Sequence, residues 1–282
     1  MSEVPDGVPD VGVTRVLHPG DMGATVAAAC SGTVLWASEG RSADAGLSDA
    51  GALASLTAAA DTVISVCPPH GAEALAAEVA DTGFTGCFVD ANAVSPATAR
   101  RIATRFENFV DGSLIGPPAR EPGTTRLYLA GPDAARVAAR FAGSLLDARV
   151  LDGDNIGTAS ALKLAYASWT KGTNALLVAV AALAAAEGVS DELTAEWGLS
   201  QSGLSQRLTY TAIRSAPKAW RWVGEMDEIA DTFASAGLPD GFHRAASEVF
   251  ARLGEFKNAR SASVEQLLKA LLNPDPPVED FG

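Results

Sequence analysis

A short turn near the N-terminus has the residue spacing of a phosphate-binding loop. The stretch Leu17–Gly23 reads LHPGDMG, and it stands between the apolar run VGVTRV and the small-residue run ATVAAAC. In the dinucleotide fingerprint G-x-G-x-x-G, the second glycine lets the backbone approach a pyrophosphate and the third lets the helix pack closely on its strand. Gly20 and Gly23 occupy these two places.

The first glycine of the fingerprint is replaced by His18, and Pro19 beside it imposes a turn by fixing φ. A helix that begins near Met22 would direct its free backbone N–H groups and the positive end of its dipole at the phosphates. An ordinary surface loop is the alternative interpretation of this motif. The candidate cofactor contacts in the turn are His18, Pro19, Gly20, Asp21, Met22 and Gly23.

The end of the second expected strand bears on the kind of dinucleotide. The segment VLWASEGRS contains Ser38, Arg41 and Ser42, and a guanidinium with a hydroxyl suits the 2′-phosphate of NADP. Glu39 in the same segment keeps NAD possible, because an acidic residue here usually binds the ribose hydroxyls. A solvated loop without a specific role is the alternative.

The elements that would position these residues alternate along the first half of the chain. Strands are expected at Val11–Leu17, Thr33–Trp36, Thr62–Cys67, Gly86–Asp90, Phe109–Leu114, Thr125–Ala130 and Ala148–Leu151, and helices at Gly23–Cys30, His70–Ala80, Pro96–Phe106 and Pro132–Leu146. Strands that are apolar throughout and separated by helix-length segments are typical of βαβ units. This half is therefore predicted to be a doubly wound α/β domain.

The second half is predicted to be all-helical, starting with one helix of residues 158–187 that is apolar enough to be buried in protein. Shorter helices are expected at Asp191–Trp197, Gly203–Ile213, Pro217–Ser235, Gly241–Leu253 and Ser263–Leu272. The predicted organisation is a flexible N-terminus of residues 1–10, a nucleotide-binding domain of residues 11–154, a helical domain of residues 155–272 and a tail of residues 273–282.

Composition excludes several classes of partner. The 282-residue chain has a net charge of −13 and 21 Lys and Arg residues, whereas nucleic acids and anionic membranes require clustered cations. Three cysteines without metal-ligand spacing indicate a reducing compartment, the cytoplasm, rather than a disulfide framework. No metal site and no secretion signal are predicted.

Five segments, taken in order, resemble motifs of one enzyme family. HPGDMGATVA, VISVCPP, FVDANAVSPATA, FVDGSLIGPPA and GTASALKLAYASWTKG are similar to conserved segments of the β-hydroxyacid dehydrogenases, which are related to 6-phosphogluconate dehydrogenase and the imine reductases. The segment PKAWRWVGEMDEIADTFASAGLPDGFHRAASEVF resembles a poorly characterised subgroup. The resemblance implies a Rossmann domain, a long interdomain helix, a helical C-terminal domain, and a homodimer whose active site lies between the domains.

The same resemblance implies roles for individual residues. Lys163 occupies the place of the family's catalytic lysine, although a lysine among apolar neighbours also simply extends its amine to solvent. The nicotinamide would contact Cys67, Pro68, Pro69 and Asn92, and the substrate would contact Ser113, Ile115, Gly116, Tyr166 and Thr170. Trp220, Trp222, Glu225, Met226 and His243 would line the substrate cleft or belong to the core.

Two departures from the family pattern concern the substrate. The asparagine four residues after the catalytic lysine is replaced by Ala167, and Tyr166 would supply the lost donor unless it is a packing aromatic. The family's S-G-G falls on Ile115, Gly116 and Pro117, so Ser113 is the remaining hydroxyl. A bulkier or less anionic substrate than a small hydroxy acid is therefore expected.

These features predict a small-molecule oxidoreductase that uses NADP to interconvert a hydroxyl and a carbonyl, with Lys163 and Tyr166 as the catalytic pair. Reduction of a C=N bond in the manner of imine reductases is one alternative, and a dimeric, non-catalytic NADP-binding module is another. Imine reductases generally lack this lysine, whereas the altered substrate loop favours them.

Overall fold

The computed structural model describes residues 13–17, 20–31, 33–36, 48–49, 53–58, 60–257 and 259–273 of the chain. The chain divides into two compact units, residues 1–164 and residues 165–282. The predicted limits of 11–154 and 155–272 remain a proposal, in which the whole long helix belongs to the second domain.

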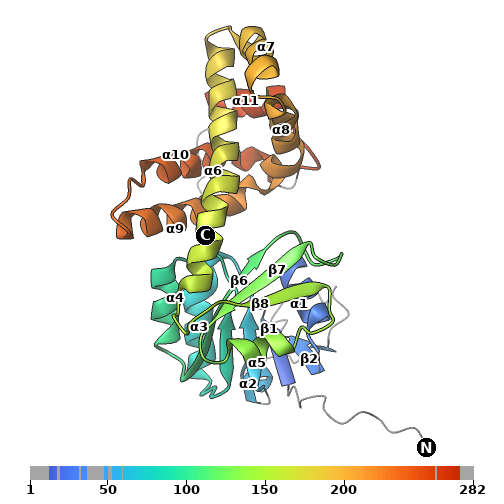
Figure 1. Ribbon diagram of the computed structural model, residues 1–282, viewed down its shortest axis with the longest axis vertical. Coiled ribbons are helices and arrows are strands. Elements are labelled where there is room, and N and C mark those ends of the chain that lie inside the picture. The colour runs from blue at the N-terminus through green and yellow to red at the C-terminus, as the bar shows by residue number, and fades with distance from the viewer. Residues whose placement is uncertain are drawn as a thin grey trace, which may run out of the picture. The chain divides into compact units, whose positions relative to one another are not determined.

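The first unit contains an eight-stranded sheet in the order β3-β2-β1-β4-β5-β6-β7-β8 (Figure 1). The first six strands of that order are parallel, which is the arrangement of a Rossmann dinucleotide-binding fold. The strands are β1 Val13–Leu17, β2 Thr33–Trp36, β3 Ser48–Asp49, β4 Thr62–Ser65, β5 Cys87–Asp90, β6 Asn108–Ile115, β7 Thr125–Ala130 and β8 Leu146–Val150.

The register aligns the carboxyl ends of the central strands. Leu17 at the end of β1 pairs with Ser65, Ser65 pairs with Asp90, and Asp90 pairs with Asp111. The segments that follow β1, β4 and β5 therefore leave the sheet at one edge, and β6 extends beyond it as far as Ile115. Ligands of open α/β sheets bind at this edge, where the strand order reverses.

Helices cover both faces of the sheet, which explains the continuously apolar strands. On one face Val26 of α1 and Val137 of α5 pack in the same core as Ile64 and Val89. On the other face the core contains residues of α2, α3 and α4 together with Val63 and Phe88. The helices are α1 Asp21–Ala29, α2 Leu53–Ala58, α3 Ala72–Asp81, α4 Pro96–Ala103 and α5 Ala134–Ala139.

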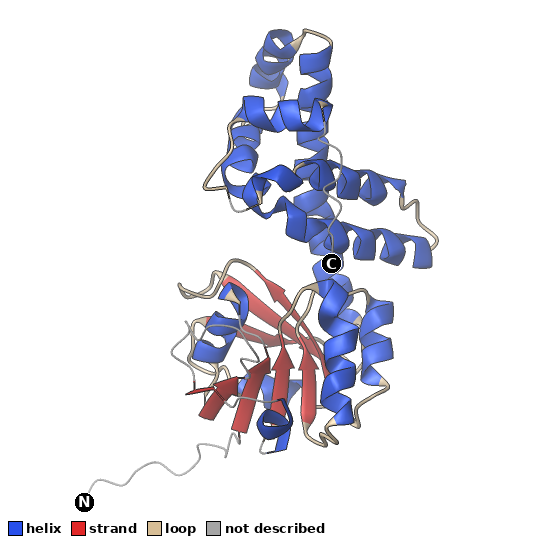
Figure 2. Cartoon of the chain, turned by 180° about the vertical axis from the view of Figure 1, so that it is seen from behind, coloured by secondary structure: helices blue, strands red, loops and turns tan. Residues whose placement is uncertain are grey.

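In the described part of the second unit every regular element is a helix (Figure 2). The helices are α6 Thr158–Ala186, which begins in the first unit, α7 Ser190–Ser200, α8 Leu204–Tyr210, α9 Trp222–Ser235, α10 Gly241–Arg252 and α11 Val264–Leu272. The expected long helix of residues 158–187 is confirmed to within one residue.

Two expectations about the elements are wrong, and two short elements were missed. The helix expected over Pro132–Leu146 ends at Ala139, because the chain turns through Gly143, with φ of +73°, and enters β8. The helix expected over Pro217–Ser235 starts as a 3-10 helix at Ala216–Arg221, with a proline in its first turn. The short elements β3 and α2 were not expected.

The sheet is also not parallel throughout. Strand β7 is antiparallel to β6, and β8 is parallel to β7. The loop of residues 116–124 joins β6 to β7 and is shorter than the roughly twelve residues that a parallel crossover requires. The last two strands therefore run opposite to the other six.

Helix α6 is long and apolar enough to cross a membrane by length and composition, with a mean hydropathy of 1.2 over 18 residues. Of that window, 39% is buried inside the protein. A single helix of this kind is weak support for a membrane span, because core helices of soluble proteins meet the same criterion.

Candidate functional site

The first turn of α1 lies at the carboxyl edge of the sheet and is capped by no side chain. Gly20 is the N-cap, with extended backbone angles of −74° and −167°, so its conformation does not require glycine. A Cβ atom added to Gly20 would meet nothing within 4 Å. Gly23 is buried, as close packing of helix and strand requires.

This turn offers backbone N–H groups and open space to an anion. Asp21 is exposed in the first turn. Its negative charge interacts favourably with the positive end of the helix dipole but would repel a bound phosphate. Met22 packs at the margin of the core. Five other predicted contacts, His18, Pro19, Ser38, Arg41 and Ser42, lie outside the described residues, as does Glu39.

The loop that follows β4 is held by a side chain from the end of β5. The Asn92 side-chain oxygen accepts a hydrogen bond from the backbone N–H of Cys67 at 2.6 Å, and its amide nitrogen donates to the Ser65 hydroxyl at 3.0 Å. The backbone N–H of Asn92 donates to Asp90 at 3.0 Å. Asn92 is buried and bonded to protein, so its described role is to shape the Cys67–Pro69 loop. Its predicted contact with the cofactor stays a prediction.

Burial raises the pKa of the Cys67 thiol to about 11, although the hydrogen bond from Ser65 opposes this shift. The nearby charge of Asp90 acts in the same direction as burial. The Cys67 thiol is therefore protonated at neutral pH and is a weak nucleophile. This cysteine is suited to lining a pocket rather than to covalent chemistry.

A buried carboxylate, that of Asp111 in β6, joins the sheet to the start of α6. One oxygen of Asp111 accepts backbone N–H groups of Gly157, Ala159 and Ser160 at 2.9, 2.8 and 3.2 Å. Its other oxygen accepts the Ser160 hydroxyl at 2.6 Å. Burial raises the pKa of Asp111, and these hydrogen bonds act in the opposite direction.

Lys163 lies one turn further along the same helix. Its ammonium donates a hydrogen bond of 2.9 Å to the carbonyl oxygen of Leu114, and the side chain is half-buried. The amine is thus held at the carboxyl end of β6 and does not extend freely into solvent. Tyr166 is half exposed, and the Thr170 hydroxyl donates to the Tyr166 carbonyl oxygen at 3.1 Å.

The predicted substrate residues of β6 face the interior. Ser113 is 0% exposed, its hydroxyl has no hydrogen-bond partner in the described part of the chain, and Ile115 is buried as well. A Cβ atom on Gly116 would lie 2.3 Å from the carbonyl oxygen of Thr124, so the turn into the β6–β7 hairpin accounts for this glycine. The substrate contacts proposed for these three residues remain untested.

Residues that would line a cleft in the second unit are largely core. Met226 is fully buried, and the Glu225 carboxylate forms an ion pair with Lys171. The Lys171 ammonium also lies 5.3 Å from the centre of the Trp222 ring. His243 is buried, and burial lowers its pKa.

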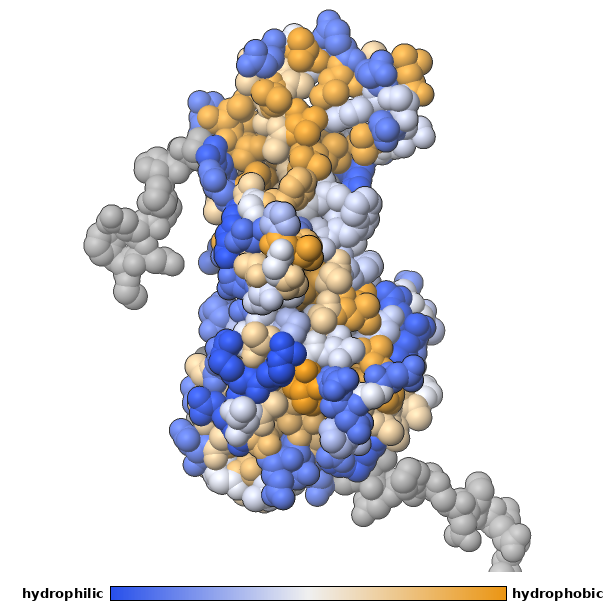
Figure 3. Space-filling view, turned by 60° about the vertical axis from the view of Figure 1, so that its left-hand side comes forward, coloured by the Kyte–Doolittle hydropathy of each residue, from blue (hydrophilic) through white to orange (hydrophobic). Residues whose placement is uncertain are grey.

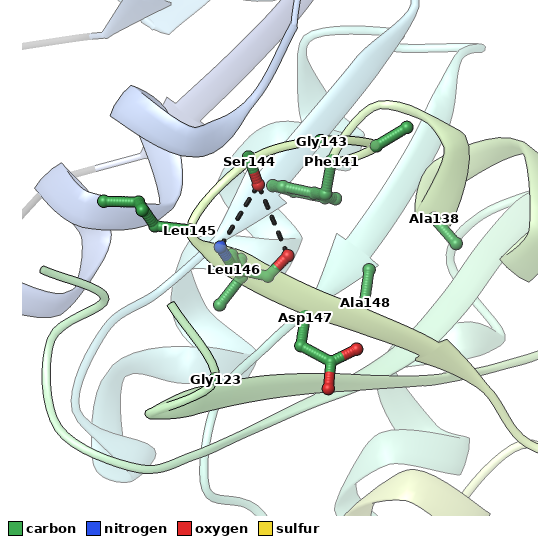
Figure 4. Close-up of a pocket in the computed structure, with 10 residues that line it drawn as sticks. Gly123, Ala138, Phe141, Gly143, Ser144, Leu145, Leu146, Asp147 and Ala148 are labelled. Carbon is green, nitrogen blue, oxygen red and sulfur yellow. Dashed lines mark hydrogen bonds between the residues drawn. The ribbon is translucent and has the colours of Figure 1, made fainter. Parts of the chain in front are cut away.

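A cavity of about 390 Å³ lies at the start of β8 (Figure 4). The hydroxyl of Ser144 is bonded to the backbone of Leu146 inside the same loop. The cavity contains none of the predicted site residues; its lining includes Gly123, Phe141, Ser144, Leu146, Asp147 and Ala148. It therefore does not mark the predicted cofactor site.

We predict that Cys67 reacts slowly with iodoacetamide at pH 8. A pKa of about 11 in place of 9.0 lowers the thiolate fraction by roughly 100-fold. The labelling rate should therefore keep rising at pH values above 9, where the rate of an exposed thiol levels off. Mass spectrometry of the Cys67 peptide measures this rate.

Asn92→Ala should accelerate this reaction, because the loop loses the acceptor for its backbone N–H. Cys67→Ser identifies the labelled peptide. Labelling of Cys67 at the rate of a small free thiol in the unaltered protein would contradict the prediction.

Comparisons with known proteins agree with this geometry. Residues 184–253 match a family model described as a domain of unknown function, DUF1932. No match was found among curated protein sequences.

Solved structures resemble the chain over nearly its whole length. A conserved hypothetical protein from Sinorhizobium meliloti 1021 is 24% identical, with a TM-score of 0.65 over 93% of this chain and 96% of that one. A 3-hydroxyisobutyrate dehydrogenase from Salmonella typhimurium is 17% identical, with a TM-score of 0.63 over 92% and 99%. A reductive aminase from Aspergillus terreus, solved with cyclohexanone and allyl amine, is 17% identical, with a TM-score of 0.52 over 92% and 99%. The resemblance seen in the sequence is therefore confirmed as a likeness of fold: the chain carries a DUF1932 match and has the fold of the hydroxyacid dehydrogenases and reductive aminases.

Proposed function

We propose that the protein is an NADP-dependent oxidoreductase that transfers a hydride between the nicotinamide and a hydroxyl or carbonyl group of a small molecule. The observation that carries this proposal is the position of Lys163, whose ammonium is hydrogen-bonded to the carboxyl end of β6. That edge of a Rossmann sheet is where a dinucleotide binds.

The residues present fit the dinucleotide. The strand order reverses between β1 and β4, and the segments that follow these two strands contain Gly20 and the Cys67–Pro69 loop. The N-terminus of α1 would bind the pyrophosphate through backbone N–H groups, since Gly20 places no side chain in the space above it. Bound NADPH would supply the hydride, and Arg41 with Ser42 would bind its 2′-phosphate.

Lys163 has the chemistry of a general acid and base. An ammonium has three N–H donors, and the Leu114 carbonyl oxygen accepts one of them. In the reductive direction another N–H would protonate the substrate oxygen as negative charge develops on it. In the oxidative direction the neutral amine would accept the hydroxyl proton. Tyr166, three residues later on the helix, is our candidate for a second donor.

The β6 loop favours a substrate without a small carboxylate. The family's serine is absent, and the Ser113 hydroxyl is buried. This observation also favours a second candidate reaction, the reduction of a C=N bond. The presence of Lys163 favours the hydroxyl and carbonyl reaction over it.

We predict that Lys163→Met abolishes carbonyl reduction, lowering kcat by about 100-fold or more, because the transition state loses its proton donor. The dissociation constant for NADPH should change less than threefold. NADPH oxidation at 340 nm with a panel of ketones, hydroxy acids and cyclic imines measures the first quantity, and fluorescence titration measures the second.

Lys218→Met, which removes an exposed lysine, is the matched control. Full turnover in Lys163→Met would sink the assignment of the proton donor. Turnover restricted to imines would favour C=N reduction, and absence of turnover with every compound would favour a binding module.

Two substitutions test the cofactor site separately. Gly20→Val should weaken NADPH and NADH alike by about tenfold or more, because the added side chain enters the space above α1. Its cost to folding should stay near 1 kcal/mol, the usual range for an N-cap change. Arg41→Ala should weaken NADPH alone, as measured by calorimetric titration. Equal affinity of the unaltered protein for both cofactors would defeat the NADP preference.

We also propose a homodimer formed through helix α6. Leu162, Trp169, Leu176 and Leu183 recur every seven residues and are all exposed, with Trp169 69% and Leu183 62% exposed. Figure 3 shows apolar side chains gathered on one face of the helical unit. Helix α7 has no buried residue in the single chain. Because an isolated helix of this length is only marginally stable in water, contact with a second copy would help to stabilise it. A heptad stripe of this kind suits packing against a second copy of the same helix.

We predict that Leu176→Asp combined with Leu183→Asp yields a folded monomer. Both side chains are exposed in the single chain, so the substitutions disrupt only the contact between copies. Sedimentation should show half the mass of the unaltered protein, while circular dichroism stays unchanged. Leu238→Asp, at an exposed leucine outside the stripe, should leave the mass as it was. If the protein without these substitutions sediments as a monomer, the homodimer proposal is contradicted.

The three cysteines, Cys30, Cys67 and Cys87, are free. This supports the proposed location in the reducing cytoplasm.

A further inference from the structure

The carboxylate of Asp111 performs the capping task that a local side chain usually performs for a helix. The first N–H groups of a helix have no partner inside it. At the start of α6 those of Gly157, Ala159 and Ser160 donate to one oxygen of Asp111, a residue from strand β6. A negative charge at this end also complements the helix dipole.

The second oxygen of Asp111 is bonded as well, because the Ser160 hydroxyl donates to it at 2.6 Å. Asp111 is 0% exposed and Ser160 is 1% exposed, so water does not compete for these groups. The start of α6 is consequently fixed in position against β6.

Lys163 is attached to the same strand at a second point. Leu114, whose carbonyl oxygen accepts the Lys163 ammonium, lies three residues after Asp111 on β6. Lys163 lies three residues after Ser160 on α6. Rotating a helix by one residue turns it through about 100°. If the Asp111 cap shifted by one residue along α6, this rotation would move the Lys163 ammonium away from the Leu114 carbonyl oxygen.

We infer that Asp111 is a positioning residue for Lys163: by capping α6 it sets the place and direction of the ammonium at the carboxyl edge of the sheet. This inference deepens the proposed function, since the catalytic consequence requires Lys163 to be the acid and base. The position of the ammonium itself is independent of that role.

The test compares Asp111→Asn and Ser160→Ala with the unaltered protein. Asparagine retains an oxygen for the three N–H groups but removes the charge, and the Ser160 hydroxyl would turn to accept from its amide. Ser160→Ala keeps the three backbone bonds and removes only the fourth, so it remains informative if Asp111→Asn does not fold. Asp147→Asn, at a carboxylate paired with Arg149, is the control for loss of one negative charge.

The first readout does not depend on activity. In competitive labelling with isotope-coded acetic anhydride, Lys163 should react several-fold faster in Asp111→Asn than in the unaltered protein, relative to the exposed Lys218. Ser160→Ala should give a smaller increase and Asp147→Asn none. Unchanged labelling of Lys163 in Asp111→Asn, or in Ser160→Ala if the former does not fold, would overturn the inference.

The second readout is the reaction. Asp111→Asn should lower kcat by about tenfold and displace the pH profile of kcat, while KM and NADPH affinity change less than threefold. If Asp111→Asn is stable and shows faster amide exchange at residues 157–160 but keeps its kcat and pH profile, Asp111 only caps the helix and has no role in catalysis. If Lys163→Met retains turnover, the proposed function fails, and the labelling result still decides whether Asp111 positions the ammonium.

Discussion

The hydrogen bonds between the Asp111 carboxylate and the start of α6 hold the first turn of this helix against strand β6. Helix α6 begins in the first unit, where Asp111 binds its first turn, and continues into the second unit. Because three backbone N–H groups converge on one buried oxygen, the helix has a single favourable rotation about its axis. The direction of the Lys163 ammonium, which donates to the Leu114 carbonyl oxygen, depends on that rotation.

The edge of the sheet that receives Lys163 is organised by bonds between neighbouring loops. Asn92 is hydrogen-bonded to the loop that follows β4, and at the same edge a Cβ atom on Gly20, the N-cap of α1, would meet nothing within 4 Å. The loop after β4 is hydrogen-bonded to Asn92, and the first turn of α1 provides backbone N–H donors of the kind that bind phosphate. This arrangement supports the proposed dinucleotide site at the carboxyl edge of the sheet.

The sequence predicted those elements whose limits depend on neighbouring residues, and it missed contacts between residues far apart in the chain. The helix expected to begin near Met22 begins at Asp21, and the helix expected over residues 158–187 ends within one residue of its predicted limit, because spacing and periodicity determine both. The cap at Asp111 joins residues 46 to 49 positions apart, so no local pattern reveals it. The Ala-rich run after Pro132 has high helix propensity as far as Ala142, yet the helix ends at Ala139, because the chain turns through Gly143 and enters β8, which pairs with β7. Asn92 was predicted to contact the cofactor, and that contact stays a prediction, because its described hydrogen-bond partners are Cys67, Ser65 and Asp90.

The reversed direction of the last two strands has a consequence for the outer border of the sheet. Among the described strands β8 pairs with β7 alone, and the outer row of backbone groups on a border strand can recruit strands from other molecules. On β8 the side chains of Asp147 and Arg149 form an ion pair, and at the opposite border β3 has only two residues. Charge at one border and brevity at the other disfavour growth of the sheet by strand addition. Both borders therefore favour the helices over the sheet as the contact of the proposed homodimer.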